Sequence, residues 1–319
     1  MNNLNNKNVL VTGGTGFVGS HLVEALVKEK AHVVTTFQTM DPQSYFFSQK
    51  LNRKTVIIKS DIFDFDEMFR IVTNNEIDFI FHLAACSLVD EAFYNPRNAY
   101  KTNVMGTVNI LESARQYPRI KGIVVASTDK SYGKIEYGRK YKESDALKGD
   151  HPYEASKAGA DLAATSYFKT YHIPVTVTRF GNIYGEGDLN FSRIIPGILK
   201  AMIRDEELGI RSDGKYIRDY LYVKDVISGY LLLAESIDKI KGEAFNFGSE
   251  ESLSVIELIK LIEKTLRKKI KHKILNTAKN EIPYQSLDYS KIQKKLGWKP
   301  KYKLIKVIHK MKKWYADSV

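Results

Sequence analysis

Cysteine and long apolar runs are what this sequence of 319 residues most clearly lacks. Its one cysteine, Cys86, excludes a disulfide framework within the chain and is typical of a reducing cytoplasm. No apolar run approaches the ~20 residues that a membrane helix needs, and the N-terminus shows no signal-peptide pattern. We therefore expect a cytoplasmic protein that inserts into no membrane.

Positive charge is in excess, with 49 Lys and Arg against 37 Asp and Glu, which gives a formal net charge of +12. The lysines are spread along the whole chain and are densest in the last fifty residues. Their spacings are mostly those of solvated helix faces. The excess therefore favours a general attraction for anionic ligands, and we do not expect a nucleic-acid partner.

Apolar runs and helical patterns alternate regularly through the first 180 residues. Near-continuous apolar strands separated by helices indicate a parallel sheet that is buried on both faces. The fold class predicted is therefore α/β, a doubly wound parallel Rossmann sheet. The expected strands are 8–12, 32–37, 55–58, 78–83, 121–126 and 175–179, and the expected helices are 17–30, 64–74, 90–116 and 152–171.

Beyond residue 180 the alternation loosens, and the glycine-rich, polar segment 181–188 reads as a loop. Helices are expected near 191–204, 225–236, 254–266 and 302–317, with short strands between them. We predict a smaller α/β lobe that closes over the sheet, while 220–223 and 244–247 return to the first lobe as strands. The predicted division gives 1–180 and about 219–249 to a dinucleotide-binding domain, and 181–218 and 250–319 to a substrate-binding lobe.

A glycine-rich turn joins the first strand to the first helix. Gly13 allows a tight turn, Gly16 lets the backbone approach a diphosphate, and Gly19 permits close packing of helix on strand. The free N–H groups of the helix that follows favour an anion. The acidic residue expected at the end of the second strand to hold an adenosine ribose is missing, and Gln38 stands in that region. NAD is the expected cofactor, with NADP left open.

Two further patterns carry catalytic chemistry. Tyr153 and Lys157 are four residues apart and lie on one face of a predicted helix, where an ammonium favours the phenolate and lowers the tyrosine pKa from about 10. Thr128, Asp129 and Lys130 end the fifth strand, at the sheet edge where such folds bind ligands. Either pattern alone is common in proteins, but together in a dinucleotide fold they predict a catalytic site.

These features resemble the extended short-chain dehydrogenase/reductases, in the epimerase/dehydratase branch. The glycines are spaced G-x-x-G-x-x-G, the pair Tyr153 and Lys157 matches the Y-x-x-x-K motif, and the segment 128–130 resembles that of the CDP-glucose 4,6-dehydratases. The resemblance covers nearly the whole chain. Its other matching segments are 81–85, 103–107, 149–153, 187–188, 193–196, 217–220 and 296–300.

The resemblance implies a reaction on the sugar of a nucleotide-sugar. Tyr153 takes the proton of the 4-hydroxyl, Lys157 holds the tyrosine ionised, and Thr128 bonds the 4-oxygen. Lys130 then removes the C5 proton as base, and Asp129 protonates the departing 6-hydroxyl. A close Asp–Lys ion pair favours the opposite protonation states, so the assignment of acid and base between these two residues stays open.

The resemblance also implies binding residues and a partner. The helices near 98–116 and 152–171 correspond to those that pair in a homodimer, and no metal is expected. The substrate set is Ser87, Thr128, Asn182, Arg193, Arg211 and Arg218, in which arginine forks suit phosphate. The cofactor set is Gly13, Gly16, Phe17, Val18, Gly19, Gln38, Asp61, Ile62, Leu83, Ala84, Ala85, Asn103, Tyr153 and Lys157.

Three functions are compatible with these residues. The first is a 4,6-dehydratase that forms an NDP-4-keto-6-deoxy sugar from an NDP-hexose of the CDP-glucose or GDP/UDP-N-acetylglucosamine class. The alternative is a nucleotide-sugar 4-epimerase, which needs Tyr153 and Lys157 but not Asp129 and Lys130. The third is a nucleotide-sensing protein without catalysis, because a fold does not guarantee its chemistry.

Overall fold

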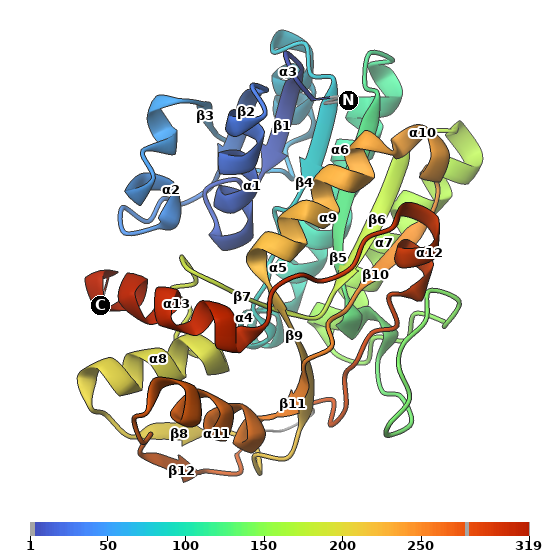
Figure 1. Ribbon diagram of the computed structural model, residues 1–319. Coiled ribbons are helices and arrows are strands. Elements are labelled where there is room, and N and C mark those ends of the chain that lie inside the picture. The colour runs from blue at the N-terminus through green and yellow to red at the C-terminus, as the bar shows by residue number, and fades with distance from the viewer. Residues whose placement is uncertain (1–3, 278–280, 319) are drawn as a thin grey trace.

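The apolar runs of the first 180 residues become the strands of one parallel sheet in the computed structural model, which describes residues 4–277 and 281–318 (Figure 1). The strand order is β10-β6-β5-β4-β1-β2-β3, and all pairings are parallel. This order confirms the predicted doubly wound Rossmann fold. The strands are β1 (Asn8–Thr12), β2 (His32–Phe37), β3 (Val56–Lys59), β4 (Phe79–His82), β5 (Gly122–Thr128), β6 (Val175–Phe180) and β10 (Ala244–Phe247).

Helices cover both faces of this sheet, because successive strand residues point to opposite sides. In β1, Val9 and Val11 pack with α1 (Phe17–Lys28) and α9 (Val223–Glu235), whereas Leu10 belongs to the core on the other face. That second core includes side chains from α3 (Phe65–Asn74), α6 (Gly106–Gln116) and α7 (Pro152–Tyr171). Burial on both faces explains why the strands are almost continuously apolar.

A smaller lobe lies below the large sheet in Figure 1 and has a hydrophobic core of its own, which includes Ile198, Leu258 and Ile308. Its sheets have the orders β11-β9-β7 and β12-β8. The strands are β7 (Asn182–Tyr184), β8 (Leu208–Ile210), β9 (Ile217–Tyr222), β11 (Ser252–Ser254) and β12 (His272–Ile274), and the helices are α8 (Ile194–Arg204), α11 (Val255–Leu266) and α13 (Leu304–Ser318).

Short elements complete the fold and connect the larger ones. They are α2 (Tyr45–Ser48), α4 (Val89–Tyr94), α5 (Pro96–Tyr100), α10 (Ile237–Ile240), α12 (Ser290–Leu296), the 3-10 turns η1 (Leu51–Arg53) and η3 (Asp129–Tyr132), and the π-helical turn η2 (Lys101–Met105). Within the described ranges, no helix has both the length and the apolar character needed to cross a membrane.

The helical stretch expected over 90–116 is confirmed in its extent, but it is divided at Asn95. Pro96 follows it and disfavours helical conformation in the preceding residue, and Asn95 has φ −133° and ψ 67°. The Asn95 side chain instead caps α5 by accepting a hydrogen bond from Asn98 N. The segment therefore consists of α4, α5, η2 and α6 in succession.

One of the two strands expected to rejoin the large sheet does not do so. The segment 244–247 pairs with β6 as β10, as predicted, whereas the strand expected at 220–223 is β9. β9 pairs with β7 and β11 and therefore belongs to the smaller lobe, not to the large sheet. The domain boundaries near 180, 219 and 249 stay a prediction.

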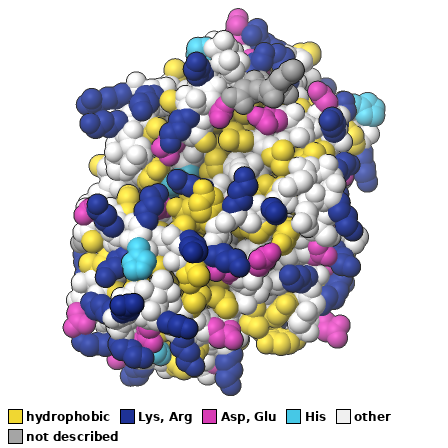
Figure 2. Space-filling view, viewed as in Figure 1, with side chains coloured by type: hydrophobic (Ala, Val, Ile, Leu, Met, Phe, Trp, Pro, Cys, Tyr) yellow, Lys and Arg dark blue, Asp and Glu magenta, His cyan; other side chains and the backbone are white. Residues whose placement is uncertain are grey.

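Charged side chains are spread over the surface seen in Figure 2, where Lys and Arg alternate with acidic, apolar and neutral groups. Some lysines pair with carboxylates across elements, as Lys291 does with Glu243 at 3.1 Å and Lys310 with Glu186 at 2.8 Å. On this face the positive excess is therefore dispersed and does not form one patch.

A buried ion pair ties α7 to the large sheet. Arg179 of β6 donates two hydrogen bonds to Asp161 of α7, at 2.8 and 2.9 Å, and its third nitrogen donates to Tyr132 at 2.7 Å. The Tyr132 hydroxyl donates in turn to Asn246 of β10 at 2.7 Å. This network joins α7, β6, η3 and β10, which are the elements around the end of β5.

Replacing Arg179 by Met should lower the free energy of unfolding by about 3–5 kcal/mol, because Asp161 then keeps an uncompensated buried charge. Urea unfolding followed by circular dichroism measures the change. The control is Arg179→Met combined with Asp161→Leu, which removes both charges and should recover much of the loss. Equal stability of the single variant and the native protein would contradict the expectation.

Candidate functional site

The turn between β1 and α1 accepts only glycine at two positions. Gly13 has φ +71°, and a Cβ there would lie 2.9 Å from the backbone nitrogen of Ala84; a Cβ on Gly19 would collide with the Gly13 carbonyl. Gly16 is the N-cap of α1 and offers no side chain to the first turn, which begins with Phe17 and Val18 and contains no acidic residue. The N–H groups of that turn are therefore suited to an anion such as a diphosphate.

The loop after β4 packs against this turn. Ala84, between Leu83 and Ala85, donates its backbone N–H to the Thr12 hydroxyl at 3.2 Å. Asn103 holds the next residue, Cys86, by accepting from its N–H at 2.8 Å and donating to its carbonyl at 3.2 Å.

The Asn103 amide also donates to the Ser156 hydroxyl of α7 at 2.9 Å. Both of its N–H groups and its oxygen are thus engaged by the protein. Asn103 therefore fixes the loop after β4 and links it to α7. Its predicted contact with the cofactor stays a prediction.

The remaining predicted cofactor residues follow β2 and β3 at the same edge of the sheet. Gln38 is exposed, and the first acidic residue after β2 is Asp41, which bonds Gln43 N at 2.8 Å within a turn. Ile62 is buried against Gly106, and Asp61 accepts a hydrogen bond from Phe63 N at 3.0 Å. The end of β2, beside the glycine turn, therefore has no carboxylate of the kind that binds an adenosine ribose.

The start of α7 places the predicted catalytic pair. A capping box between His151 and Glu154 begins the helix, so Tyr153 lies in its first turn and Lys157 one turn later. The Lys157 ammonium donates to the Ala126 carbonyl of β5, and burial lowers the Lys157 pKa to about 8.

The expected lowering of the tyrosine pKa is wrong for the chain by itself. Burial, and after it the charge of Asp129, raises the Tyr153 pKa to about 12. A hydrogen bond with the Thr128 hydroxyl and the charge of Arg193 oppose this rise without cancelling it. Desolvation outweighs the nearby cations, and the spacing of two residues in a sequence carries no information about desolvation.

The end of β5 brings the other candidates beside Tyr153. The Thr128 hydroxyl donates to Asp129 Oδ1 at 3.1 Å, and Lys130 Nζ lies 3.9 Å from the same oxygen. The Asp129 side chain is fully buried, while 23% of the Lys130 side chain is exposed. Lys130 also helps to lower the pKa of Glu154, a minor effect against the rise that burial causes there. A second acid–base pair therefore lies next to the Tyr153 phenol.

One residue of this group, Gln285, was not among the predicted site residues. Gln285 Nε2 donates to Asp129 Oδ2 at 3.2 Å, and both side chains are fully buried. The contact joins residues 156 positions apart. Gln285 belongs to no motif, so no local pattern of the sequence could have identified it.

Two of the predicted substrate residues, Asn182 and Arg193, belong to the smaller lobe. Asn182 of β7 has a buried Nδ2 with no hydrogen-bond partner among the described residues, so this donor is available to a ligand. Arg193 immediately precedes α8, and its charge reaches Tyr153, where it lowers the pKa. Its guanidinium also donates to Asp188 at 3.1 Å.

The other predicted substrate residues lie further out. Arg218 donates to Glu281 at 3.1 Å and is mostly buried, whereas Arg211 donates to Asp90 of α4 at 3.3 Å, with both side chains exposed. Ser87 is exposed in the loop that follows Cys86. Both arginines are therefore already paired with carboxylates, as Arg193 is with Asp188.

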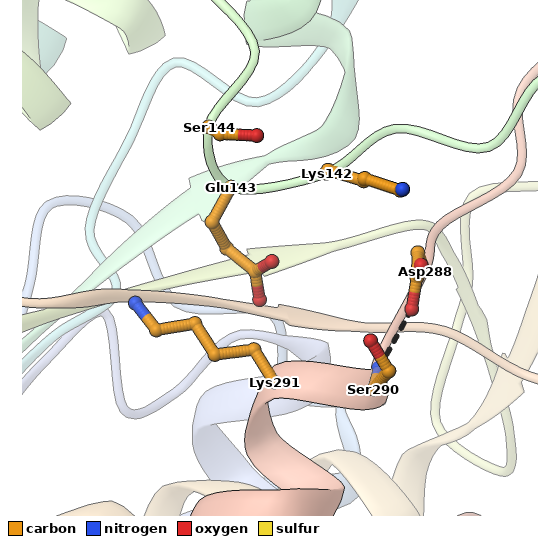
Figure 3. Close-up of a pocket in the computed structure, with 6 residues that line it drawn as sticks. All are labelled: Lys142, Glu143, Ser144, Asp288, Ser290 and Lys291. Atoms are coloured by element: carbon orange, nitrogen blue, oxygen red, sulfur yellow. Dashed lines mark hydrogen bonds between the residues drawn. The ribbon is translucent and has the colours of Figure 1, made fainter.

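A surface hollow of about 470 Å³ lies outside this group (Figure 3). Residues 142–144 line one side, and Asp288, Ser290 and Lys291 line the other. Glu143 extends across it, and its carboxylate accepts a hydrogen bond from Asn246 N at 2.8 Å. The hollow contains none of the predicted site residues.

The switch point of the sheet, the glycine turn and the Tyr153–Lys157 pair together define a Rossmann-fold protein of the short-chain dehydrogenase/reductase class. The chain belongs to the GDP-mannose 4,6-dehydratase family, whose model matches residues 10–311. This membership confirms the resemblance to the epimerase/dehydratase branch that the motifs indicated.

Individual relatives include both dehydratases and epimerases. The CDP-glucose 4,6-dehydratase of Salmonella typhimurium is 31% identical over 97% of this chain and 90% of that protein. Among solved structures, the UDP-glucose 4-epimerase of Thermotoga maritima with UDP-glucose has a TM-score of 0.87 at 30% identity, covering 98% of this chain and 99% of that one. The dTDP-glucose 4,6-dehydratase of Bacillus anthracis with NAD has a TM-score of 0.85 at 27% identity, covering 98% and 97%.

Replacing Lys157 by Met should raise the melting temperature of the ligand-free protein at neutral pH by a few degrees, because a buried ammonium is removed. The folded pKa of about 8 lies below the ordinary 10.5, so between these values the unfolded chain binds more protons and native stability rises with pH. The advantage of the variant should therefore be full below pH 8 and shrink toward pH 10.5.

Thermal melts across this pH range test the expectation. The control is Lys169→Met, which removes an exposed lysine from the same helix and should leave the melting temperature unchanged. A Lys157→Met protein that melts at or below the native temperature at neutral pH would contradict it.

Proposed function

We propose that this protein is a nucleotide-sugar 4,6-dehydratase that uses NAD and converts an NDP-hexose to the NDP-4-keto-6-deoxy sugar. The observation that carries the proposal is the position of Asp129 and Lys130 beside Tyr153. Water loss from C5 and C6 needs an acid and a base in addition to the Tyr153–Lys157 pair, and these two residues supply them. Membership of a 4,6-dehydratase family supports the same conclusion.

The residues present fit a dinucleotide. The glycine turn and the uncapped first turn of α1 suit the diphosphate, and Lys157 suits the nicotinamide ribose. When bound, NAD supplies the oxidant that accepts hydride from C4 of the sugar and later returns it to C6. The related Bacillus anthracis dehydratase was solved with NAD, which supports NAD over NADP for this chain.

Tyr153 is the proposed base for the sugar 4-hydroxyl. Because its pKa is about 12 in the chain alone, where Lys157 is already present, its ionised form needs further positive charge close by, which a bound cationic nicotinamide would provide. The Thr128 hydroxyl, already bonded to Tyr153, is suited to hold the 4-oxygen. Oxidation at C4 then acidifies the proton on C5.

Lys130 and Asp129 are proposed to complete the elimination. Lys130 takes the C5 proton, the C6–O bond breaks, and the Asp129 proton converts the departing hydroxyl to water. When the hydride returns to C6, Lys130 gives its proton back to C5, and the proton that Tyr153 took from the 4-hydroxyl restores Asp129 through Thr128, which bonds both residues. Tyr153, Lys130 and Asp129 are thereby returned to their starting states for the next turnover.

The substrate class proposed is a nucleoside-diphosphate hexose of the CDP-glucose or GDP/UDP-N-acetylglucosamine type. Arg193 and Asn182 are the best placed to meet its diphosphate, because one acts on Tyr153 and the other has a free buried donor. Arg211 and Arg218 are further candidates, each paired with a carboxylate as Arg193 is.

A nucleotide-sugar 4-epimerase is the second candidate, favoured by the similarity to the Thermotoga maritima epimerase. Epimerisation needs the oxidation by Tyr153 and Lys157, followed by rotation of the ketone and reduction. It makes no use of Asp129 or Lys130. The two functions are therefore separated by these two residues.

Incubation with a panel of nucleotide-sugars, followed by mass spectrometry, should show loss of water from one of them with no net consumption of NAD. Asp129→Asn and Lys130→Ala should slow this loss roughly a hundredfold or more while sparing oxidation at C4. Epimerised product alone, or full activity of both variants, would favour the epimerase.

We further propose that the protein is a homodimer that pairs through the segment 89–116 and α7. Large apolar side chains are exposed on these elements, which is unusual for a surface that water covers. They are Phe93, Tyr94, Tyr100, Met105, Leu162 and Tyr171, with exposed fractions from 43% to 84%.

Light scattering on the purified protein should give the mass of a dimer. Leu162→Glu should shift it toward the monomer, because Leu162 is 58% exposed on α7 and a buried carboxylate in the interface would lack a partner. Leu275→Glu is the matched control, since Leu275 is 46% exposed but lies in the smaller lobe. A monomeric native protein would overturn this proposal.

A further inference from the structure

Residues 283–288, here called the strap, run as an extended segment between β9 and Tyr141. On one side, Ile217 N donates to the Pro283 carbonyl at 3.0 Å, and Gln285 N donates to the Ile217 carbonyl at 3.1 Å. On the other side, Tyr141 N donates to the Ser286 carbonyl at 2.9 Å. The backbone around Gln285 is therefore held from both sides.

Asp219 fixes the far end of the strap. Its carboxylate accepts hydrogen bonds from Leu287 N at 3.1 Å and from Ser249 N at 2.9 Å. These bonds set the direction of the strap and so place the Gln285 side chain against Asp129. Gln285 thus comes from a segment attached to the smaller lobe, whereas Asp129 follows β5 of the large sheet.

Asp129 has a defined set of neighbours. Its Oδ1 faces the Thr128 hydroxyl and the Lys130 ammonium, and its Oδ2 faces Gln285. The other ionisable groups that its charge reaches are Tyr153 of α7, Tyr141, and Asp219 of β9. Gln285 is thus the hydrogen-bond partner of Oδ2, the oxygen that neither Thr128 nor Lys130 contacts in the described structure.

The Gln285 amide has a hydrogen-bond acceptor that no described residue uses. Its Nε2 donates to Asp129, while its Oε1 is buried with no hydrogen-bond partner among the described residues. An amide carries a donor and an acceptor of nearly equal shape, so half a turn about its last bond exchanges the two. In one orientation Gln285 bonds an ionised carboxylate, and in the other it accepts the proton of a carboxylic acid.

We infer that Gln285 is a positioning residue that bonds Asp129 in both of its protonation states. The inference rests on the proposed dehydratase function, in which Asp129 gives up its proton and regains it in every turnover. A side chain that only donates would hold the carboxylate alone, and one that only accepts would hold the acid alone. Gln285 keeps the carboxyl group in one place through the whole cycle.

The test compares Gln285→Leu with the native enzyme in single-turnover experiments on the nucleotide-sugar that the panel identifies. Oxidation at C4, followed by cofactor absorbance, should keep its rate. Water loss, followed by mass spectrometry, should become roughly tenfold to a hundredfold slower, because a hydrogen bond to a buried charged group is lost.

The pH profile supplies a readout that a merely structural role would not change. The amide N–H stabilises the carboxylate, so its removal favours protonated Asp129, and the alkaline limb of the water-loss step should move to higher pH. Gln285→Glu should move this limb further, because two adjacent carboxyl groups share one proton. In an Asp129→Asn background, Gln285→Leu should have little further effect.

Ser286→Ala is the matched control. Ser286 is the next residue of the strap and is also fully buried, but its hydroxyl bonds Ser252 at 2.9 Å and not Asp129. This variant should keep both rates and the pH profile.

The outcomes separate the two proposals. A native enzyme that removes water from no nucleotide-sugar refutes the dehydratase function. A native enzyme that does so, with Gln285→Leu matching it in rate and pH profile, overturns the role of Gln285. Equal loss of C4 oxidation and water loss in Gln285→Leu, with a lowered melting temperature, assigns the residue to folding only and overturns the inference as well.

Discussion

The burial of the large sheet on both faces is the constraint from which the rest of the molecule follows. Helices cover each face, so polar chemistry is confined to the edges where strands end. At the carboxyl edge, β1 leads into the glycine turn and β5 into Thr128 and Asp129. The site therefore lies where the backbone stops pairing and its polar groups become available to a ligand.

Placing ionisable groups at this edge is energetically costly. Asp129 is fully buried, the Lys157 ammonium is desolvated, and burial raises the pKa of Asp219 to about 6. Such groups persist only when the surrounding structure holds them firmly. The Arg179–Asp161 pair serves this purpose, because it fixes α7, which carries Tyr153 and Lys157, against β6. Bonds made away from the candidate site thus help to hold its buried ionisable groups in place.

The sequence predicted the large sheet well because its strands are short apolar runs bounded by turns. The strands predicted at 8–12, 32–37 and 244–247 have the same first and last residues as β1, β2 and β10. The helical stretch over 90–116 has the predicted extent but is divided at Asn95, because the following proline disfavours helical conformation in that residue. β9 was assigned to the wrong sheet because its partners, β7 and β11, are chosen by long-range packing that apolar patterning does not encode.

The candidate site divides in the same way. Thr128, Asp129 and Tyr153 were predictable, because a strand end and a helix start place them by local rules. The raised pKa of Tyr153 and the contact from Gln285 were not, since both depend on burial and on segments far apart in the sequence. Local motifs predict which groups are present, whereas tertiary contacts determine their protonation states.

In the proposed mechanism, the two lobes contribute different parts of the chemistry. The large sheet supplies the groups proposed for oxidation at C4, namely the glycine turn, Tyr153 and Lys157. The smaller lobe adds Asn182 and Gln285, and Gln285 bonds the acid that only elimination requires. Because the two candidate reactions share the proposed oxidation step, we infer that the groups gathered around the end of β5 decide the outcome after oxidation. A chain that changed only these groups would keep its fold and its cofactor while changing its product.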